Sequence, residues 1–187
     1  MKNINPLFLL ILIITNYGCS QQKNNEKLNF KNTIELSIES TSSKINPIIK
    51  EINILLKEGK SDDKLMEMYI DCKSTIKSNK QLIKELIEVD NDNNLKSGTI
   101  KYLENCEKIL DSFILPAIKY LNESEDFDRN KMMEAFNLIQ TAINQASDLS
   151  ESLEIFCDKY KLPREMSDFD KNDYQQKIDE IKSKLEN

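Results

Sequence analysis

The sequence has 187 residues, a formal net charge of −6 at pH 7, three glycines, four prolines, and no histidine or tryptophan. This length suits a single domain, and the acidic charge excludes a protein that holds the nucleic-acid backbone through clustered Lys and Arg. The lack of histidine excludes Ser-His-Asp and Cys-His catalysis, and it excludes the Glu-x-x-His ligands of di-iron bundles. Because Gly and Pro are scarce, turns are few and the elements between them are long.

The chain begins with an apolar run that stops at a cysteine. Lys2 is the only charged residue before Cys19, and residues 7–14 read LFLLILII. This run is too short to span a bilayer as a helix, and it has the length of the apolar part of a signal peptide. Gly18 precedes Cys19, and polar residues follow without a transition.

These features resemble a bacterial lipoprotein signal, in which signal peptidase II cuts before a cysteine that becomes acylated. Asn16 stands where the usual pattern has Leu, a departure that spirochaetal lipoproteins tolerate. The resemblance implies a signal peptide over residues 1–18, fatty acylation (palmitate) at Cys19, and a membrane anchor. The alternative is an ordinary secretory signal in which Cys19 is incidental. The processed chain carries 25 Lys and Arg against 32 Asp and Glu, a charge of −7.

The first helix is expected after a short polar segment. Residues 20–27 read SQQKNNEK and have no apolar period, so we expect residues 19–27 to form a flexible tether. From residue 28 a helical stripe follows, with spacings of four and three. Pro47 falls off this stripe, and it either kinks the helix or separates two helices. The stripe consists of Ile34, Ile38, Thr41, Ile45, Ile48, Ile52 and Leu55.

Three more helical stripes follow, separated by polar turns at residues 90–94 and 122–128. Pro116 lies inside the third helix and is expected to bend it. The second stripe is Leu65, Met68, Tyr69, Cys72, Ile76, Leu82, Ile83, Leu86 and Val89. The third is Tyr102, Leu103, Cys106, Ile109, Leu110, Phe113, Ala117 and Tyr120. The fourth is Met132, Met133, Phe136, Ile139, Ile143, Ala146, Leu149, Leu153, Phe156 and Tyr160.

The last segment, from Asp168, carries a narrow stripe on which Tyr174, Ile178, Ile181 and Leu185 lie. No useful stretch alternates with period two, so the sequence predicts an all-α protein. Each of the first four helices is expected to have about 25–30 residues, or about 40 Å. Short connections favour antiparallel neighbours. We therefore expect one domain over residues 28–187, an elongated antiparallel four-helix bundle with an additional C-terminal helix.

The three cysteines after Cys19 are expected to be free and buried. In a helical hairpin that turns near residue 92, Cys72 and Cys106 are about 10 Å apart along the axis. Disulfide bonding requires Cα atoms within about 7 Å, and Cys157 matches neither height. With no CxxC and no histidine, zinc is disfavoured, and each thiol is expected to pack as a small hydrophobe.

The acidic turns bear a partial likeness to calcium loops. Asp90-x-Asp92-x-Asn94 has the start of such a loop, but Leu95 stands at the position of the required Gly, and Lys101 at that of the bidentate Glu. The same spacing in residues 168–172 fails similarly. Both segments are better explained as turn and capping residues. Nothing in the sequence assembles a nucleophile, a base and an oxyanion donor, so we expect no enzyme activity, no metal and no cofactor.

A few apolar residues fall off the stripes, among them Phe127 between two aspartates. Such residues either pack under the fifth helix or form a partner-binding patch. In an up-down-up-down bundle anchored near residue 28, the turn at 122–128 lies at the tip away from the membrane. We expect a partner to contact this tip, with Phe127 as apolar anchor. The charged rim would be Glu123, Glu125, Asp126 and Asp128.

The loose lipoprotein signal, the Lys-, Asn- and Ile-rich composition and the helical stripes together resemble the small helical outer-surface lipoproteins of borrelial spirochaetes. That resemblance implies an antigenic, lipid-anchored protein of the outer membrane, exposed at the cell surface. It also implies a non-catalytic module that binds a host protein, such as a complement or matrix component. The alternative is a periplasm-facing lipoprotein with a structural or envelope-assembly role. Dimerisation is compatible with either reading.

Overall fold

The structure is a computed structural model that describes residues 6–58, 64–123 and 129–163. In these ranges the chain is helical apart from short connecting turns, and it contains no strand, which confirms the all-α prediction. The predicted helix after Asp168 lies outside the described residues. The elements are α1 (Pro6–Glu58), α2 (Lys64–Glu85), α3 (Leu95–Ile109), the π-helix η1 (Leu110–Ile114), α4 (Leu115–Glu123) and α5 (Arg129–Tyr160).

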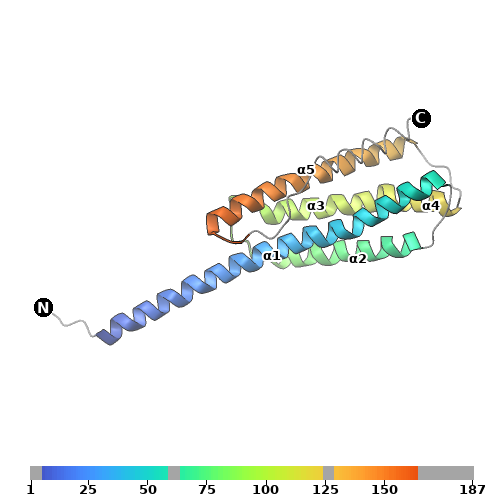
Figure 1. Cartoon of the computed structure of the whole chain (residues 1–187). Coiled ribbons are helices and arrows are strands. Elements are labelled where there is room, and N and C mark those ends of the chain that lie inside the picture. The colour runs from blue at the N-terminus through green and yellow to red at the C-terminus, as the bar shows by residue number, and fades with distance from the viewer. Residues whose placement is uncertain (1–5, 59–63, 124–128, 164–187) are drawn as a thin grey trace.

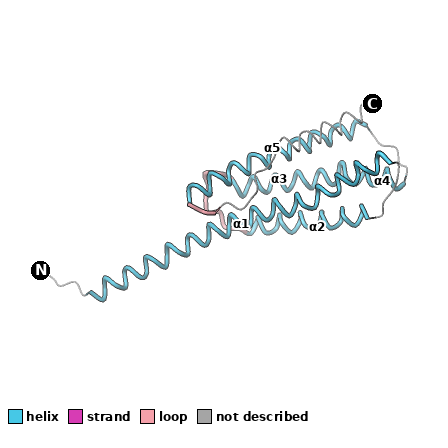
Figure 2. The backbone as a smooth tube through the Cα atoms, viewed as in Figure 1, coloured by secondary structure: helices cyan, strands magenta, loops and turns pink. Residues whose placement is uncertain are grey.

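The helices lie lengthwise beside one another (Figure 1). Helix α1 packs on α2, α2 on α3, and α3 on α5, while α5 also contacts α1. The N-terminal part of α1 extends beyond the other helices (Figure 1). We call the end of the bundle from which it extends the projecting end; the turn between α2 and α3 and the end of α5 lie there. The end of α1, the start of α2, the end of α4 and the start of α5 lie at the other end, the far end (Figure 2).

Helix α1 buries the stripe that the sequence predicted. Ile34 and Ile48 are 0% exposed, and the stripe stays buried as far as Leu55. Pro47 lies inside this helix without ending it, because its side chain is exposed and points away from the buried stripe. Since the missing N–H of proline falls on the outer face, the core side of α1 stays continuous.

Residues 20–27 are helical and belong to α1, which has 53 residues. The structure therefore differs here from the expected flexible tether. The physical reason is that residues 20–27 contain no Gly and no Pro, so nothing in this segment stops helix propagation. The buried side chains of Phe30 and Ile34 fix the helix directly after it.

The third predicted helix contains a π-helical turn directly before Pro116. The N–H of Leu115 donates to the carbonyl of Leu110, five residues back, where an α-helix would use a carbonyl four residues back. The extra residue in this turn rotates the following helix, so Ile114 and Ile118 are fully buried. Tyr120, which the sequence placed on the stripe, is instead 41% exposed.

Helix α2 ends at Glu85, earlier than its predicted stripe, and residues 86–94 form the turn to α3. Leu82 was predicted in the core but is 52% exposed. Its place on the inner face is taken by Asn79 and Ile83, both buried. The prediction failed here because it followed hydrophobicity alone, and Asn79 is polar.

Candidate functional site

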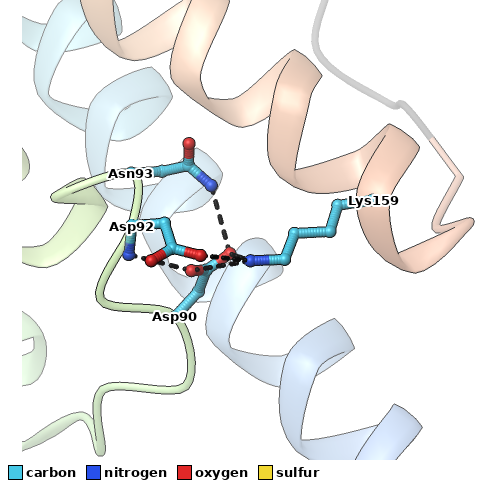
Figure 3. A network of polar contacts seen from close by, with 4 residues as sticks. All are labelled: Asp90, Asp92, Asn93 and Lys159. Carbon is cyan, nitrogen blue, oxygen red and sulfur yellow. Dashed lines mark hydrogen bonds and ion pairs between the residues drawn. The ribbon is translucent and has the colours of Figure 1, made fainter.

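The densest group of charged contacts lies at the projecting end. It consists of Asp90, Asp92 and Asn93, in the turn after α2, and Lys159, near the end of α5 (Figure 3). We call it the end network. It joins residues that are 67 and 69 positions apart in the sequence. The network is the first place to look for chemistry, because it brings two carboxylates and an ammonium together.

Asp90 is the centre of this network. Its side chain is 1% exposed. It accepts hydrogen bonds from the backbone N–H of Asp92 at 3.0 Å and from the Asn93 amide at 3.1 Å. The Lys159 ammonium lies 3.2 and 3.1 Å from its two oxygens and 2.8 Å from the carboxylate of Asp92. The local bonds within 90–93 confirm the prediction that this segment uses turn chemistry, since an Asp that accepts from the N–H two residues on forms an Asx-turn.

Asp90 and Lys159 hold each other in the charged form. Burial raises the pKa of the Asp90 carboxyl, but the N–H of Asp92 and the ammonium of Lys159 outweigh burial, so that pKa lies below its usual value. The carboxylates of Asp92 and Asp90 raise the pKa of Lys159 above its usual range. At neutral pH the pair is therefore fully ionised. Neither group has a pKa near 7, as a general acid or base requires.

In the end network, the ammonium of Lys159 occupies the position between the carboxylates at which a metal ion would bind. The ammonium of Lys159 lies where the carboxylates of Asp90 and Asp92 converge (Figure 3). Within the part of the chain that the structure describes, no group of three or more His, Cys, Asp or Glu side chains is arranged to hold a metal ion.

An aromatic cluster flanks the end network and includes α1. The ring centroids of Phe156 and Tyr160 are 4.8 Å apart, and those of Phe30 and Phe156 are 5.7 Å apart. The Lys27 ammonium lies 3.8 Å from the centre of the Tyr160 ring, a cation–π contact. Lys27 therefore lies level with the last turn of α5.

A second polar cluster lies where the π-helix faces α2. Asp111 accepts hydrogen bonds from the Tyr69 hydroxyl at 2.8 Å and from the Lys73 ammonium at 2.6 Å. Burial raises the pKa of the Tyr69 hydroxyl above its usual value. Burial also raises the pKa of Asp111, but Lys73 and Tyr69 outweigh it and lower that pKa overall. A tyrosine with a raised pKa beside an ionised Asp is not an activated base, so the cluster serves to join α2 to η1.

Sequence reasoning missed the buried asparagines. The amide of Asn79, on α2, donates to the Ser37 carbonyl at 3.1 Å, the Ser40 hydroxyl at 2.9 Å and the Thr41 hydroxyl at 3.0 Å. The amide of Asn105, on α3, donates to the Leu138 carbonyl at 2.9 Å. Both positions have the helical spacing of the core stripes, which is the signal that was available. They tie neighbouring helices together by directional bonds.

Cys72, Cys106 and Cys157 are free and buried, as predicted. Burial raises the pKa of the Cys72 thiol to about 12, and that of Cys106 likewise to about 12. A thiol with such a pKa is protonated at neutral pH and is a poor nucleophile. These cysteines therefore act as small core residues.

The residues predicted for partner binding fall at the edge of the structure. Phe127, Glu125, Asp126 and Asp128 lie outside the described residues. Glu123 is the last residue of α4, at the far end of the bundle. Cys19 lies in α1, eight residues before Lys27, whose ammonium contacts the Tyr160 ring at the end of α5.

No family model, curated protein or solved structure matches this chain. Among the described residues, no helix has a stretch both long and apolar enough to cross a membrane.

Proposed function

We propose that this chain is a bacterial outer-membrane lipoprotein, acylated at Cys19 and exposed at the cell surface, whose helical bundle binds a host protein without catalysing a reaction. The observation that carries the proposal is the position of Cys19. It stands where an apolar signal-like run ends, and the helix that contains it continues into the buried core at Phe30 and Ile34. A lipid at that position holds one end of the bundle at the membrane and leaves the other end free.

In this proposal the charged groups and thiols described above stabilise the bundle and take no part in a reaction. The carboxylates of Asp90 and Asp111 are paired with lysines, and the thiols of Cys72 and Cys106 are protonated. The finer architecture that we propose is an antiparallel up-down-up-down four-helix bundle with an additional C-terminal helix folded back along it. In that arrangement Phe127 and its acidic neighbours stand at the far end, which a partner reaches first.

The lipid anchor is tested with the variant Cys19→Ala. If Cys19 is acylated, the wild-type chain incorporates a palmitate analogue and enters the detergent phase, and the variant does neither. Unchanged labelling of the variant would remove the basis of the proposed localisation.

Surface exposure and binding need two further measurements. Protease added to intact cells should degrade a surface protein but spare a periplasm-facing one, which separates the proposal from its alternative of an envelope-assembly role. A pull-down from host serum with the processed chain, in wild-type form and as Phe127→Ala, then tests for a ligand and for the proposed contact. Loss of the ligand with the variant, while the helical content stays unchanged, supports the tip; equal binding by both directs attention to a lateral helix face.

A further inference from the structure

Among the side chains whose exposure the structure describes, the most exposed large apolar one is Ile87, at 82%. It lies in the turn after α2, at the projecting end of the bundle. Single exposed apolar side chains are common on protein surfaces, but Ile87 gains free energy if an apolar or partly apolar surface covers it. We therefore ask which surface could cover Ile87 at the projecting end.

The length of the helix between Cys19 and the bundle answers this. Lys27 is level with Tyr160 at the end of α5, because its ammonium contacts that ring at 3.8 Å. From Cys19 to Lys27 the chain is helical, so the two residues are about 12 Å apart along the axis. The distance between Cys19 and Lys27 is fixed because residues 19–27 are helical. A flexible coil would leave this distance variable.

A lipid on Cys19 places that residue at the boundary between acyl chains and headgroups. The headgroup layer on each side of a bilayer is about 5–8 Å thick. The projecting end therefore stands within about 7 Å of the headgroup surface when α1 is perpendicular to the membrane. Any tilt of α1 brings one side of that end still closer.

We propose that the anchored α1 tilts so that the projecting end of the bundle rests on the lipid headgroups, with Ile87 inserted among them as an apolar contact. This inference depends on the proposed acylation of Cys19 and adds a second, non-covalent contact with the same membrane. The end network supports it, because Lys159 fixes the 90–93 segment against α5, and so the turn that carries Ile87 keeps its position.

The chemistry of this end indicates a contact that does not depend on lipid charge. The exposed charges at this end are of both signs: Lys84, Lys159 and Lys161 lie beside Glu26, Glu85, Asp92 and Asp158. With both signs present, attraction to anionic headgroups is small, and the apolar contact of Ile87 decides the interaction. Vesicles of phosphatidylcholine alone are therefore a sufficient partner.

The test uses the fact that the sequence contains no tryptophan. Ile87→Trp introduces one probe at the projecting end, and Asn91→Trp supplies a second probe on the same turn. Ile70→Trp is the matched control, since Ile70 is 59% exposed on α2 and lies about 20 Å further from the proposed membrane surface. Each lipidated variant is reconstituted into phosphatidylcholine vesicles that contain brominated lipid, which quenches nearby tryptophan.

We expect the emission of Ile87→Trp and Asn91→Trp to shift to shorter wavelength and to be quenched, while Ile70→Trp keeps its emission. If all variants float with the vesicles and none is quenched, the contact does not exist and the lipid anchor stands alone. Quenching of the Ile70→Trp variant as well would mean that the bundle lies flat, which overturns the end-on contact. If the wild-type chain does not float with the vesicles at all, the anchor itself is absent and the proposed function fails with it.

Discussion

The ammonium of Lys159 lies 3.1 Å from Oδ2 of Asp90, and this ion pair joins the last turn of α5 to the turn between α2 and α3. Asp90 is almost fully buried, whereas its neighbour Asp92 is 80% exposed and shares the same lysine. The two aspartates share one lysine but differ in burial. Their substitution therefore compares a buried carboxylate, which has a structural role, with an exposed one.

We expect Asp90→Ala to lower the free energy of unfolding by about 1–3 kcal/mol, because the N–H of Asp92 and the amide of Asn93 lose their acceptor. The exposed Asp92→Ala should change it by about 0.5 kcal/mol or less. Urea unfolding followed by circular dichroism measures both. Equal effects would mean that burial does not set the strength of this network.

The lowered pKa values of Asp90 and Asp111 predict the pH dependence of stability. The pKa values of both carboxyls in the folded protein lie below the ordinary value of 3.8, which we take as the unfolded value. For such a group, the unfolded state binds more protons, so its contribution is present above pH 3.8 and is lost as pH falls through the folded pKa. Melting temperatures should therefore drop as the pH falls below about 4. The drop should be smaller in Asp90→Asn, and an unchanged drop would assign the acid sensitivity to other carboxyls.

Phe136 is fully buried, and its ring centroid lies 6.0 Å from that of Phe113. Phe136→Ala should lower the free energy of unfolding by about 3–5 kcal/mol, since it removes buried apolar atoms and leaves a cavity. Glu134→Ala, two residues away on the exposed face of α5, is the control and should stay within about 0.5 kcal/mol. Small effects at both positions would show that α5 does not pack as described.

Asn79→Ala removes the amide that donates to three acceptors on α1. The hydroxyl of Thr41, which is 0% exposed, then loses its cross-helix partner, and we expect a loss of about 1–3 kcal/mol. Ser78→Ala, which changes the exposed residue next to Asn79, serves as the control. A neutral Asn79→Ala would mean that water or a rotated Ser40 replaces the bonds.

The buried thiols should be unreactive in the folded protein. In Cys19→Ala, a thiol reagent at pH 8 should label none of Cys72, Cys106 and Cys157 quickly, because each is buried and the pKa of the first two is about 12. Denaturant should make all three react. Rapid labelling of one cysteine before unfolding would identify a helix that opens locally.

Much of the fold follows from hydrophobic spacing. The stripe from Ile34 to Leu55 is buried as predicted, because 3.6-residue periodicity places those side chains on one face of a helix. The burial of Ile114 and Ile118 was not predictable in this way, because the π-helical turn inserts a residue and changes the phase. Asn79 was overlooked since its burial depends on acceptors that only the neighbouring helix supplies.

The end network could likewise be predicted only in part from the sequence. The local bonds of residues 90–93 could be predicted, because an Asx-turn needs only adjacent residues. Lys159 could not be assigned to that turn, since it lies 69 residues from Asp90 and only the packing of α5 against α3 brings them together. Contacts between residues far apart in the sequence depend on the rotation and register of the helices. The hydrophobic stripes alone do not determine either.

Helix α1 is the element that extends from the bundle, and it also runs the length of the core to the far end. A pull between an anchored Cys19 and a ligand held at the far end would therefore act along the helix axes. In this shear geometry the contacts of α1 with α2 and α5 bear the load simultaneously. They do not break one after another. With its helices side by side along one long axis, the bundle is suited to resist mechanical tension along that axis.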